Sequence, residues 1–198
     1  YYPLWKISDG YSGWKFKEEN IEGVDVYRCP LYVPSHPKTI TRMLHLFSFA
    51  FTSMFVLFRL LFWKPDVIVC VTPTFFCTPM AKLYSVLTGA KFWLHIQDFE
   101  VDAMFGLGMM KKGLLAKVAY WLEKKALQGA HKVSTSSKVM QTISVEKGVR
   151  KENSVFFPNW VDTDFISPAA SDEFYRQEWK YTDKKVVYLY TTNKDEQF

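Results

Sequence analysis

The sequence has few cysteines, and they stand in no pattern that forms a disulfide framework or binds a metal. Only three occur among 198 residues (Cys29, Cys70 and Cys77), and none belongs to a C-x-x-C pair. Their odd number and wide spacing argue against a small disulfide-stabilised domain and against a zinc site, and they fit a reducing compartment.

Nothing at the N-terminus of this sequence looks like a signal peptide. The first residues, Tyr1-Tyr2-Pro3-Leu4-Trp5, contain neither the basic region nor the apolar region that a signal peptide needs, and no initiator methionine precedes them. We therefore expect a processed chain, a truncated chain or an internal segment of a longer protein. The length allows one large domain, or one domain and part of another.

Acidic residues are absent between Asp25 and Asp66, although the chain as a whole carries a net charge of only +5. Five basic residues fall in this interval: Arg28, Lys38, Arg42, Arg59 and Lys64. Such a local positive field favours an anionic membrane surface or a polyanionic partner, although a modest basic excess can also serve solubility alone. A nucleic-acid partner is not expected, because the charge surrounds an apolar helix rather than strands with interleaved aromatic residues.

Aromatic and aliphatic residues, by contrast, are abundant: 48% of the chain is hydrophobic and 18% is aromatic. The longest apolar run predicts a helix from Thr39 or Thr41 to about Trp63, with Lys64-Pro65 as its end. Its length approaches that of a bilayer span, but Arg59 and several polar residues oppose a span. Three interpretations stay open: a packed helix with a membrane-facing stripe, which we favour, a buried helix, and a true span. The membrane-binding candidates are Arg42, Arg59, Trp63 and Lys64.

The remaining elements alternate between strand and helix. Residues 1–23 show no clean period and are interpreted as loop, and residues 24–28 alternate as a short strand. Strands are then expected at 66–71, 91–96, 132–135 and 153–157, with helices at 78–88, about 113–128 and about 137–146. This order predicts the α/β class, a doubly wound parallel sheet with helices on both faces. A further strand at 184–190 begins a second domain that the chain leaves incomplete.

Polar side chains cluster directly after the predicted strand at 91–96. The stretch KFWLHIQDFEVDAM places His95, Gln97, Asp98, Glu100 and Asp102 at or beyond the end of an apolar run. In open α/β sheets, ligands bind beyond the carboxyl ends of the strands, so these residues are candidates for the functional site. Each has a structural alternative: Asp98 as a helix cap, His95 as a hydrogen-bonded core residue and Trp93 as core.

These motifs resemble one known family. The order HIQDFEVDAM, long helix, KVSTSS and VFFPNWVDTDFISP is similar to the N-terminal half of a retaining glycosyltransferase of the GT-B fold, family 4. The closest likeness is to members resembling fucosyltransferases of colanic-acid (exopolysaccharide) biosynthesis, and it covers essentially residues 1–190. Its most specific pieces are QDFEVDAM and the hinge FPNWVD; the apolar helix at 43–63 also matches a membrane-associated helix of this group.

The resemblance implies a Rossmann-like acceptor-binding domain at 1–160 and a hinge with a truncated donor-binding domain at 161–198. The implied enzyme transfers a sugar from a nucleotide diphosphate sugar to a lipid-linked oligosaccharide at the inner face of the plasma membrane. The candidate donor is GDP-fucose. It also implies Asp98 as the catalytic residue. His95, Gln97, Phe99, Glu100 and Asp102 would bind substrate. No metal and no other cofactor are expected.

The sequence also departs from the family. The first strand of the family and its glycine-rich loop precede the segment seen here, and the loop Thr191–Asp195 contains no glycine. A backbone without the freedom that glycine gives does not easily approach a phosphate. We therefore expect this chain alone to be inactive, and the alternative function is a non-catalytic remnant or an accessory domain that binds a membrane surface.

Overall fold

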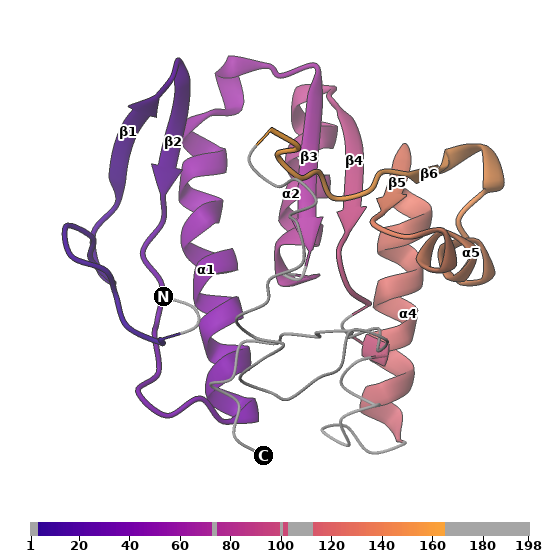
Figure 1. The fold of residues 1–198 in the computed structure, drawn as a ribbon, viewed down its shortest axis with the longest axis horizontal. Helices are drawn as coiled ribbons and strands as arrows, with labels where there is room; N and C mark the ends of the chain where they lie inside the picture. The colour runs from indigo at the N-terminus through magenta and orange to yellow at the C-terminus, as the bar shows by residue number, and fades with distance from the viewer. Residues whose placement is uncertain (1–3, 73–74, 100, 103–112, 165–198) are drawn as a thin grey trace, which may run out of the picture. The chain divides into compact units, whose positions relative to one another are not determined.

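The structure is a computed structural model, and it describes residues 4–72, 75–99, 101–102 and 113–164. Contacts between Cα atoms divide the chain into two units, Tyr1–Pro158 and Asn159–Phe198. The first unit holds every helix and strand described below (Figure 1). The strand predicted at 184–190 lies outside the described residues.

The chain begins with a β-hairpin, half of which the sequence analysis missed. Strand β1 (Lys17–Ile21) pairs antiparallel with strand β2 (Val24–Arg28), so the interpretation of residues 1–23 as loop is wrong for β1. Glu22 and Gly23 form the turn, and both have positive φ, as a two-residue hairpin turn that matches the twist of its strands requires. Glu19 of β1 forms an ion pair with Arg28 of β2, which stabilises the register.

Helix α1 (Thr39–Arg59) confirms the predicted long helix, and a 3-10 turn continues it to Trp63. The residue at the N-cap position is Lys38 rather than Thr39 or Thr41. The Thr41 hydroxyl instead reaches back and accepts a hydrogen bond from the Lys38 N–H at 2.8 Å. Thr52 donates to the carbonyl of Pro30 at 2.6 Å, so α1 is docked on the chain that leaves the hairpin.

Four parallel strands form the sheet, in the order β3 (Val67–Thr72), β4 (Lys91–Ile96), β5 (Lys132–Thr135) and β6 (Ser154–Phe156). Helix α2 (Thr78–Thr88) connects β3 to β4, α4 (Leu114–Gly129) connects β4 to β5, and α5 (Lys138–Glu146) connects β5 to β6. The predicted α/β class with a parallel, Rossmann-like sheet is therefore confirmed, and Figure 1 shows the sheet flanked by helices.

Local signals in the sequence account for most of these boundaries. Pro79 lies in the first turn of α2, and Gly89 ends the helix with φ of 78°, a conformation that a residue with a side chain rarely adopts. Ser137 caps α5 by accepting a hydrogen bond from the Met140 N–H at 3.2 Å. Gly148, with φ of 104°, follows that helix.

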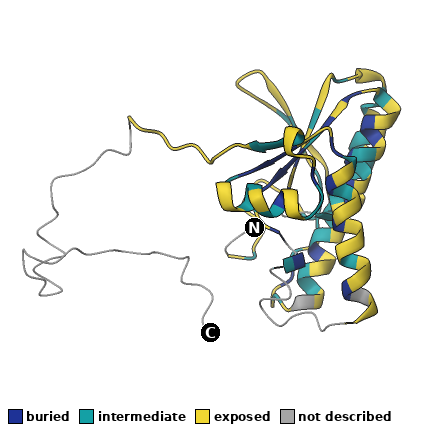
Figure 2. Cartoon of the chain, turned by 90° about the vertical axis from the view of Figure 1, so that its right-hand side faces the viewer, coloured by how far each residue is buried: buried dark blue, intermediate teal, exposed yellow. Residues whose placement is uncertain are grey.

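The core lies between the sheet and its helices. Phe92, Leu94 and Val133 are almost completely buried on the central strands, and Leu127 of α4 and Val149 pack against them. Figure 2 shows these strands in dark blue inside the unit, while the outer faces of the helices are exposed. Each such buried side chain contributes about 1.5–3 kcal/mol to stability. The central strands are therefore a rigid support for the residues that follow their carboxyl ends.

Candidate functional site

The predicted site begins where β4 ends. His95 and Ile96 complete the strand, and Gln97, Asp98 and Phe99 follow it directly. The strand is held on both sides by parallel neighbours, β3 and β5, so its end has a fixed position. The polar residues of the motif therefore leave the sheet at its carboxyl edge, as predicted from the sequence.

His95 is built into the protein interior rather than exposed to a ligand. Its side chain is 7% exposed, its Nδ1 lies 2.7 Å from Ser134 Oγ, and its Nε2 lies 2.6 Å from Gln97 Nε2. Burial lowers the pKa of His95, which favours the neutral ring. A neutral ring with its proton on Nδ1 satisfies both contacts, because it donates to Ser134 and accepts from the Gln97 amide.

The hydroxyl group of Ser134 links strand β5 to strand β4. Its hydroxyl also accepts a hydrogen bond from Trp93 Nε1 at 2.7 Å, so one buried oxygen of β5 receives donors from both Trp93 and His95 of β4. The aromatic ring of Phe157 packs edge-on against both side chains, with centroids 6.1 and 5.6 Å away. This arrangement fixes the strand end that precedes Asp98.

Asp98 and Phe99 have opposite environments. The Asp98 side chain is exposed, whereas Phe99 is buried in the core cluster. Asp98 lines a hollow of about 10 Å³ together with Phe99 and Glu123, which is room for about one water and not for a sugar. Glu100, another of the predicted substrate-binding residues, lies outside the described residues.

Asp102 is engaged in an ion-pair network. Lys147, next to the end of α5, lies 2.9 Å from Asp102 Oδ2 and 2.5 Å from Glu123 Oε2 of α4. The Tyr120 hydroxyl donates to Asp102 Oδ1 at 3.0 Å, and the Lys147 ammonium lies 5.0 Å from the centre of the Phe99 ring. Two helices therefore hold the segment that carries Asp98, Phe99 and Asp102.

The electrostatics of this network follow from burial. Burial raises the pKa of Glu123, although Lys147 opposes the change. Burial alone would lower the pKa of Lys147, but the carboxylates of Glu123 and Asp102 raise it overall. A buried carboxylate with a cationic partner is costly to leave unpaired, so Lys147 holds the network together.

Sequence reasoning missed Glu123 and Lys147. Glu123 lies in the helix predicted at about 113–128, Lys147 directly follows the helix predicted at about 137–146, and 24 residues separate the two along the chain. Glu123 alone carried a signal, because it lies four residues before Leu127 and therefore on the same face of the helix as that apolar residue. The ion pair between Lys147 and Glu123 is a tertiary contact, which no local sequence pattern predicts.

No metal centre is seen in the described ranges. Within them, no group of three or more His, Cys, Asp or Glu side chains is placed to hold an ion. Cys70 is buried, and burial raises the pKa of its thiol to about 11, so it is a poor ligand and a poor nucleophile near neutral pH.

Helix α1 carries an exposed stripe of large apolar residues, here called the α1 stripe: Ile40, Leu44, Phe47, Phe51, Phe55 and Phe58. The segment Ile40–Arg59 is long and apolar enough to cross a membrane, and only 11% of an apolar stretch of 18 residues within it is buried inside the protein. The interpretation as a purely buried helix is therefore wrong. By length and composition alone, a span is weakly supported, and contacts with the hairpin segment and with α2 show a docked helix.

The four predicted membrane-binding residues lie around the two ends of this helix. Trp63 and Lys64 are exposed in the turn that follows it. Arg59 forms an ion pair with Glu18 of β1, and the Arg42 guanidinium lies 5.6 Å from the centre of the Trp5 ring. Both arginines thus contact the protein; Arg59 is exposed, whereas Arg42 is partly buried.

Comparison with known proteins identifies relatives. Residues 7–160 match the family model described as a glycosyl transferase 4-like domain. The chain is 46% identical over 199 residues to a protein of Escherichia coli (strain K12) that carries the name colanic acid biosynthesis glycosyl transferase WcaI. That alignment covers 98% of this chain and 48% of the relative, so the chain spans about half the length of the curated protein it matches.

Proposed function

Because this chain belongs to the glycosyl transferase 4-like family, we propose that it is the acceptor-binding half of a glycosyltransferase of exopolysaccharide synthesis. The reaction would move a sugar from a nucleotide diphosphate sugar to a lipid-linked oligosaccharide, with retention at the anomeric carbon. The name of the relative supports colanic acid as the polymer. GDP-fucose is the donor we would assay first, and no metal or other cofactor is proposed.

One observation carries this proposal: an exposed carboxylate directly follows a fixed strand end within the matched region. Asp98 comes two residues after β4, and the network of Asp102, Lys147 and Glu123 holds the segment that follows it. Transfer of a glycosyl group passes through a positively charged, oxocarbenium-like state, which a nearby carboxylate stabilises. In the proposal Asp98 supplies that charge, and Phe99 and Asp102 keep it in place; His95 and Gln97 fix the strand end.

The test is an isosteric change in the full-length protein. Asp98→Asn removes the charge and keeps the shape, so we expect turnover to fall about 100-fold or more while the melting temperature stays unchanged. Asp66→Asn is the matched control, because Asp66 is an exposed aspartate just before β3, at the opposite edge of the same sheet. Release of nucleoside diphosphate is the readout, and undiminished turnover in Asp98→Asn would remove Asp98 from the mechanism.

A second candidate function, a non-catalytic domain that binds a membrane surface, is favoured by the α1 stripe. Exposed aromatic residues on one side of a helix, with basic residues at its ends, are typical of segments that lie in a membrane interface. In the enzyme proposal the same stripe would place the protein at the inner face of the plasma membrane, where a lipid-linked acceptor is presented. The two candidates therefore share a membrane-binding surface and differ in catalysis.

Vesicle binding tests the stripe, and sugar transfer separates the candidates. Phe51→Ser with Phe55→Ser should abolish co-sedimentation with phosphatidylglycerol vesicles, whereas Val86→Ser with Val139→Ser, exposed on α2 and α5, should not. Equal sedimentation of both variants would argue against the stripe. Vesicle binding by a full-length protein that transfers no sugar would favour the non-catalytic function.

A further inference from the structure

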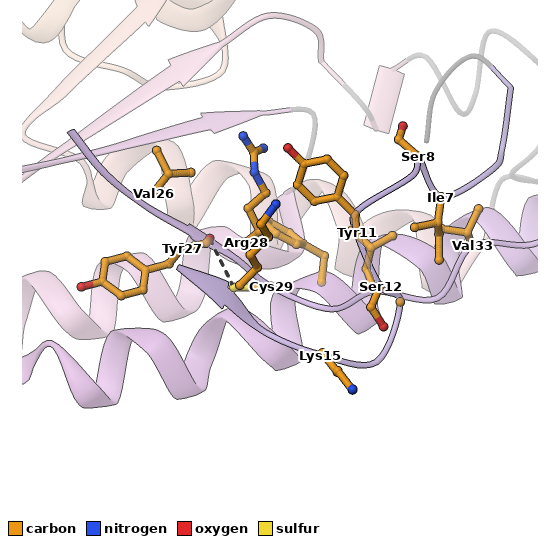
Figure 3. Close-up of a pocket in the computed structure, with 14 residues that line it drawn as sticks. Ile7, Ser8, Tyr11, Ser12, Lys15, Val26, Tyr27, Arg28, Cys29 and Val33 are labelled. Atoms are coloured by element: carbon orange, nitrogen blue, oxygen red, sulfur yellow. Dashed lines mark hydrogen bonds between the residues drawn. The ribbon is translucent and has the colours of Figure 1, made fainter. Parts of the chain in front are cut away.

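A hollow of about 470 Å³ lies between the loop that precedes β1, the strand β2 and helix α1 (Figure 3). Its volume is in the range of small-molecule sites. The residues of the predicted site do not line it, since its walls come from residues 7–17, 26–33 and Phe49.

The charge of the lining is positive. Lys15, Lys17 and Arg28 line the hollow, and no acidic residue is among the lining residues. Glu19 stands beside it, 3.2 Å from the Lys17 ammonium and also paired with Arg28. Glu19 pairs with two of the three cations, but the lining itself holds three cations and no carboxylate, which suits an anionic group.

Tyr11 orders two of these cations. The Lys17 ammonium lies 4.2 Å from the centre of the Tyr11 ring, and the Arg28 guanidinium carbon lies 5.1 Å from it. Figure 3 shows the Arg28 head group and the Tyr11 hydroxyl on the same side of the hollow. Cations held over an aromatic ring lose less side-chain freedom on binding, so this corner is prepared for a phosphate.

The other walls offer both hydroxyl groups and apolar surface. Ser8 and Ser12 line the loop side, and Ile7, Leu31 and Phe49 supply carbon-rich surface. A bare phosphate would use only the cations. A sugar would use all three kinds of group, because its hydroxyls need hydrogen-bond partners and its C–H faces pack on apolar side chains.

The position of the hollow argues against a lipid chain as its occupant. Phe49 is two residues from both Phe47 and Phe51, which places it on the opposite side of α1 from the α1 stripe. A lipid chain inserted beside the stripe would therefore lie across the helix from the Phe49 wall of the hollow. The cationic corner is nearer the stripe, because Lys17 and Arg28 also line a smaller hollow beside Phe55. The hydroxyl-bearing walls instead fit the polar part of a substrate.

We propose that this hollow binds a glycosyl phosphate, with the phosphate on Lys17, Arg28 and Tyr11 and the sugar against Phe49 and the serines. The inference rests on the proposed function, in which the sugar next to the phosphate of a lipid-linked acceptor would be the natural occupant. A free sugar phosphate shares this chemistry. Both sources predict that sugar and phosphate are needed together.

The experiment is a direct binding measurement on the purified protein. By calorimetry, a hexose 1-phosphate should bind at least tenfold more tightly than inorganic phosphate, the free hexose or a prenyl phosphate. Lys15→Gln with Lys17→Gln should weaken that binding about tenfold, because the charge-assisted hydrogen bond of Lys17 and the positive charge of Lys15 in the lining are lost. Arg28 remains available to pair with Glu19 in this variant. Lys124→Gln with Lys125→Gln, which removes two exposed lysines of α4, is the matched control.

Several outcomes would overturn the inference. Unchanged hexose 1-phosphate binding in the Lys15/Lys17 variant would place the ligand elsewhere, and equal binding of inorganic phosphate would reduce the site to an anion site. Tighter binding of the prenyl phosphate than of the hexose 1-phosphate would show that the hollow binds lipid rather than sugar.

If the wild-type chain binds the hexose 1-phosphate as expected and the full-length protein transfers no sugar, the proposed function fails and the binding site stands. If a full-length Lys15/Lys17 variant transfers sugar with an unchanged KM for the acceptor, the proposed binding site is refuted and the proposed function stands.

Discussion

Replacing Lys147 by methionine should destabilise the protein by about 3 kcal/mol. Glu123 is only 5% exposed, and the Lys147 side chain beside it is 16% exposed, so the change leaves a buried carboxylate without its cation. Breaking a buried pair in this way costs about 3–5 kcal/mol, and we take the lower end because the Lys147 side chain retains some contact with water. The pair with Asp102, whose side chain is 43% exposed, adds little.

The pH dependence of this loss gives the sharper test. Burial raises the pKa of Glu123 above its ordinary value of 4.5, and removal of Lys147 takes away the opposing influence, so the pKa rises further. A carboxyl group whose pKa is higher in the folded state stabilises that state at low pH and loses this contribution as the pH rises through its folded pKa. The penalty of Lys147→Met should therefore be largest near pH 8 and shrink as the pH falls towards 4.5.

Urea denaturation at several pH values is the assay, and a double variant is the control. Glu123→Gln with Lys147→Met removes both charges, so it should be more stable at pH 8 than Lys147→Met alone. A loss under 1 kcal/mol at pH 8, or a loss that is the same at pH 5 and pH 8, would refute the reasoning. Either result would mean that Glu123 is not held as a buried anion.

Three further variants or measurements test other parts of the structure. Ser134→Ala should cost about 1–3 kcal/mol in urea denaturation, because the buried donors of Trp93 and His95 lose their acceptor, and a neutral result would show that water replaces the hydroxyl. Ser137→Ala should cost about 1 kcal/mol by the same assay through loss of the α5 cap, and no change would mean that the helix end is frayed. Cys70, with a pKa of about 11, should resist iodoacetamide at pH 8 in the folded protein and react after denaturation, as followed by mass spectrometry; rapid labelling in the native state would contradict its burial.

Local sequence signals predicted most of the fold because residues near the ends of most helices and strands mark where those elements begin and stop. The apolar run of β4, the proline at the start of α2 and the glycine at its end all act within a few residues. The hairpin shows where this fails. Strand β1 reads Lys-Glu-Glu-Asn-Ile, with little intrinsic strand preference, and it forms through its antiparallel pairing with β2, to which the ion pair of Glu19 with Arg28 adds a side-chain contact. The Glu22-Gly23 turn was the available signal.

The candidate site was predictable in place but not in detail. The end of β4 could be inferred from the strand pattern, and the structure puts the polar motif there. The sequence could not show that the Asp102 carboxylate contacts Lys147, because contacts between distant helices depend on packing. It also left two roles open for His95, and both ring nitrogens now prove to contact protein groups. Asp98 keeps its predicted role as a proposal.

Strand β3 has a consequence for handling the protein. Among the described residues its only ladder partner is β4, so its other edge is open within them. Val67, Val69 and Val71, which alternate along the strand and share one face of the sheet, are exposed beside that edge. An open edge with β-branched side chains is a template on which further strands add. Preparations of this chain should therefore associate as their concentration rises, through sheet extension rather than through the α1 stripe. Charge placed at Val69 should suppress that association and leave vesicle binding untouched.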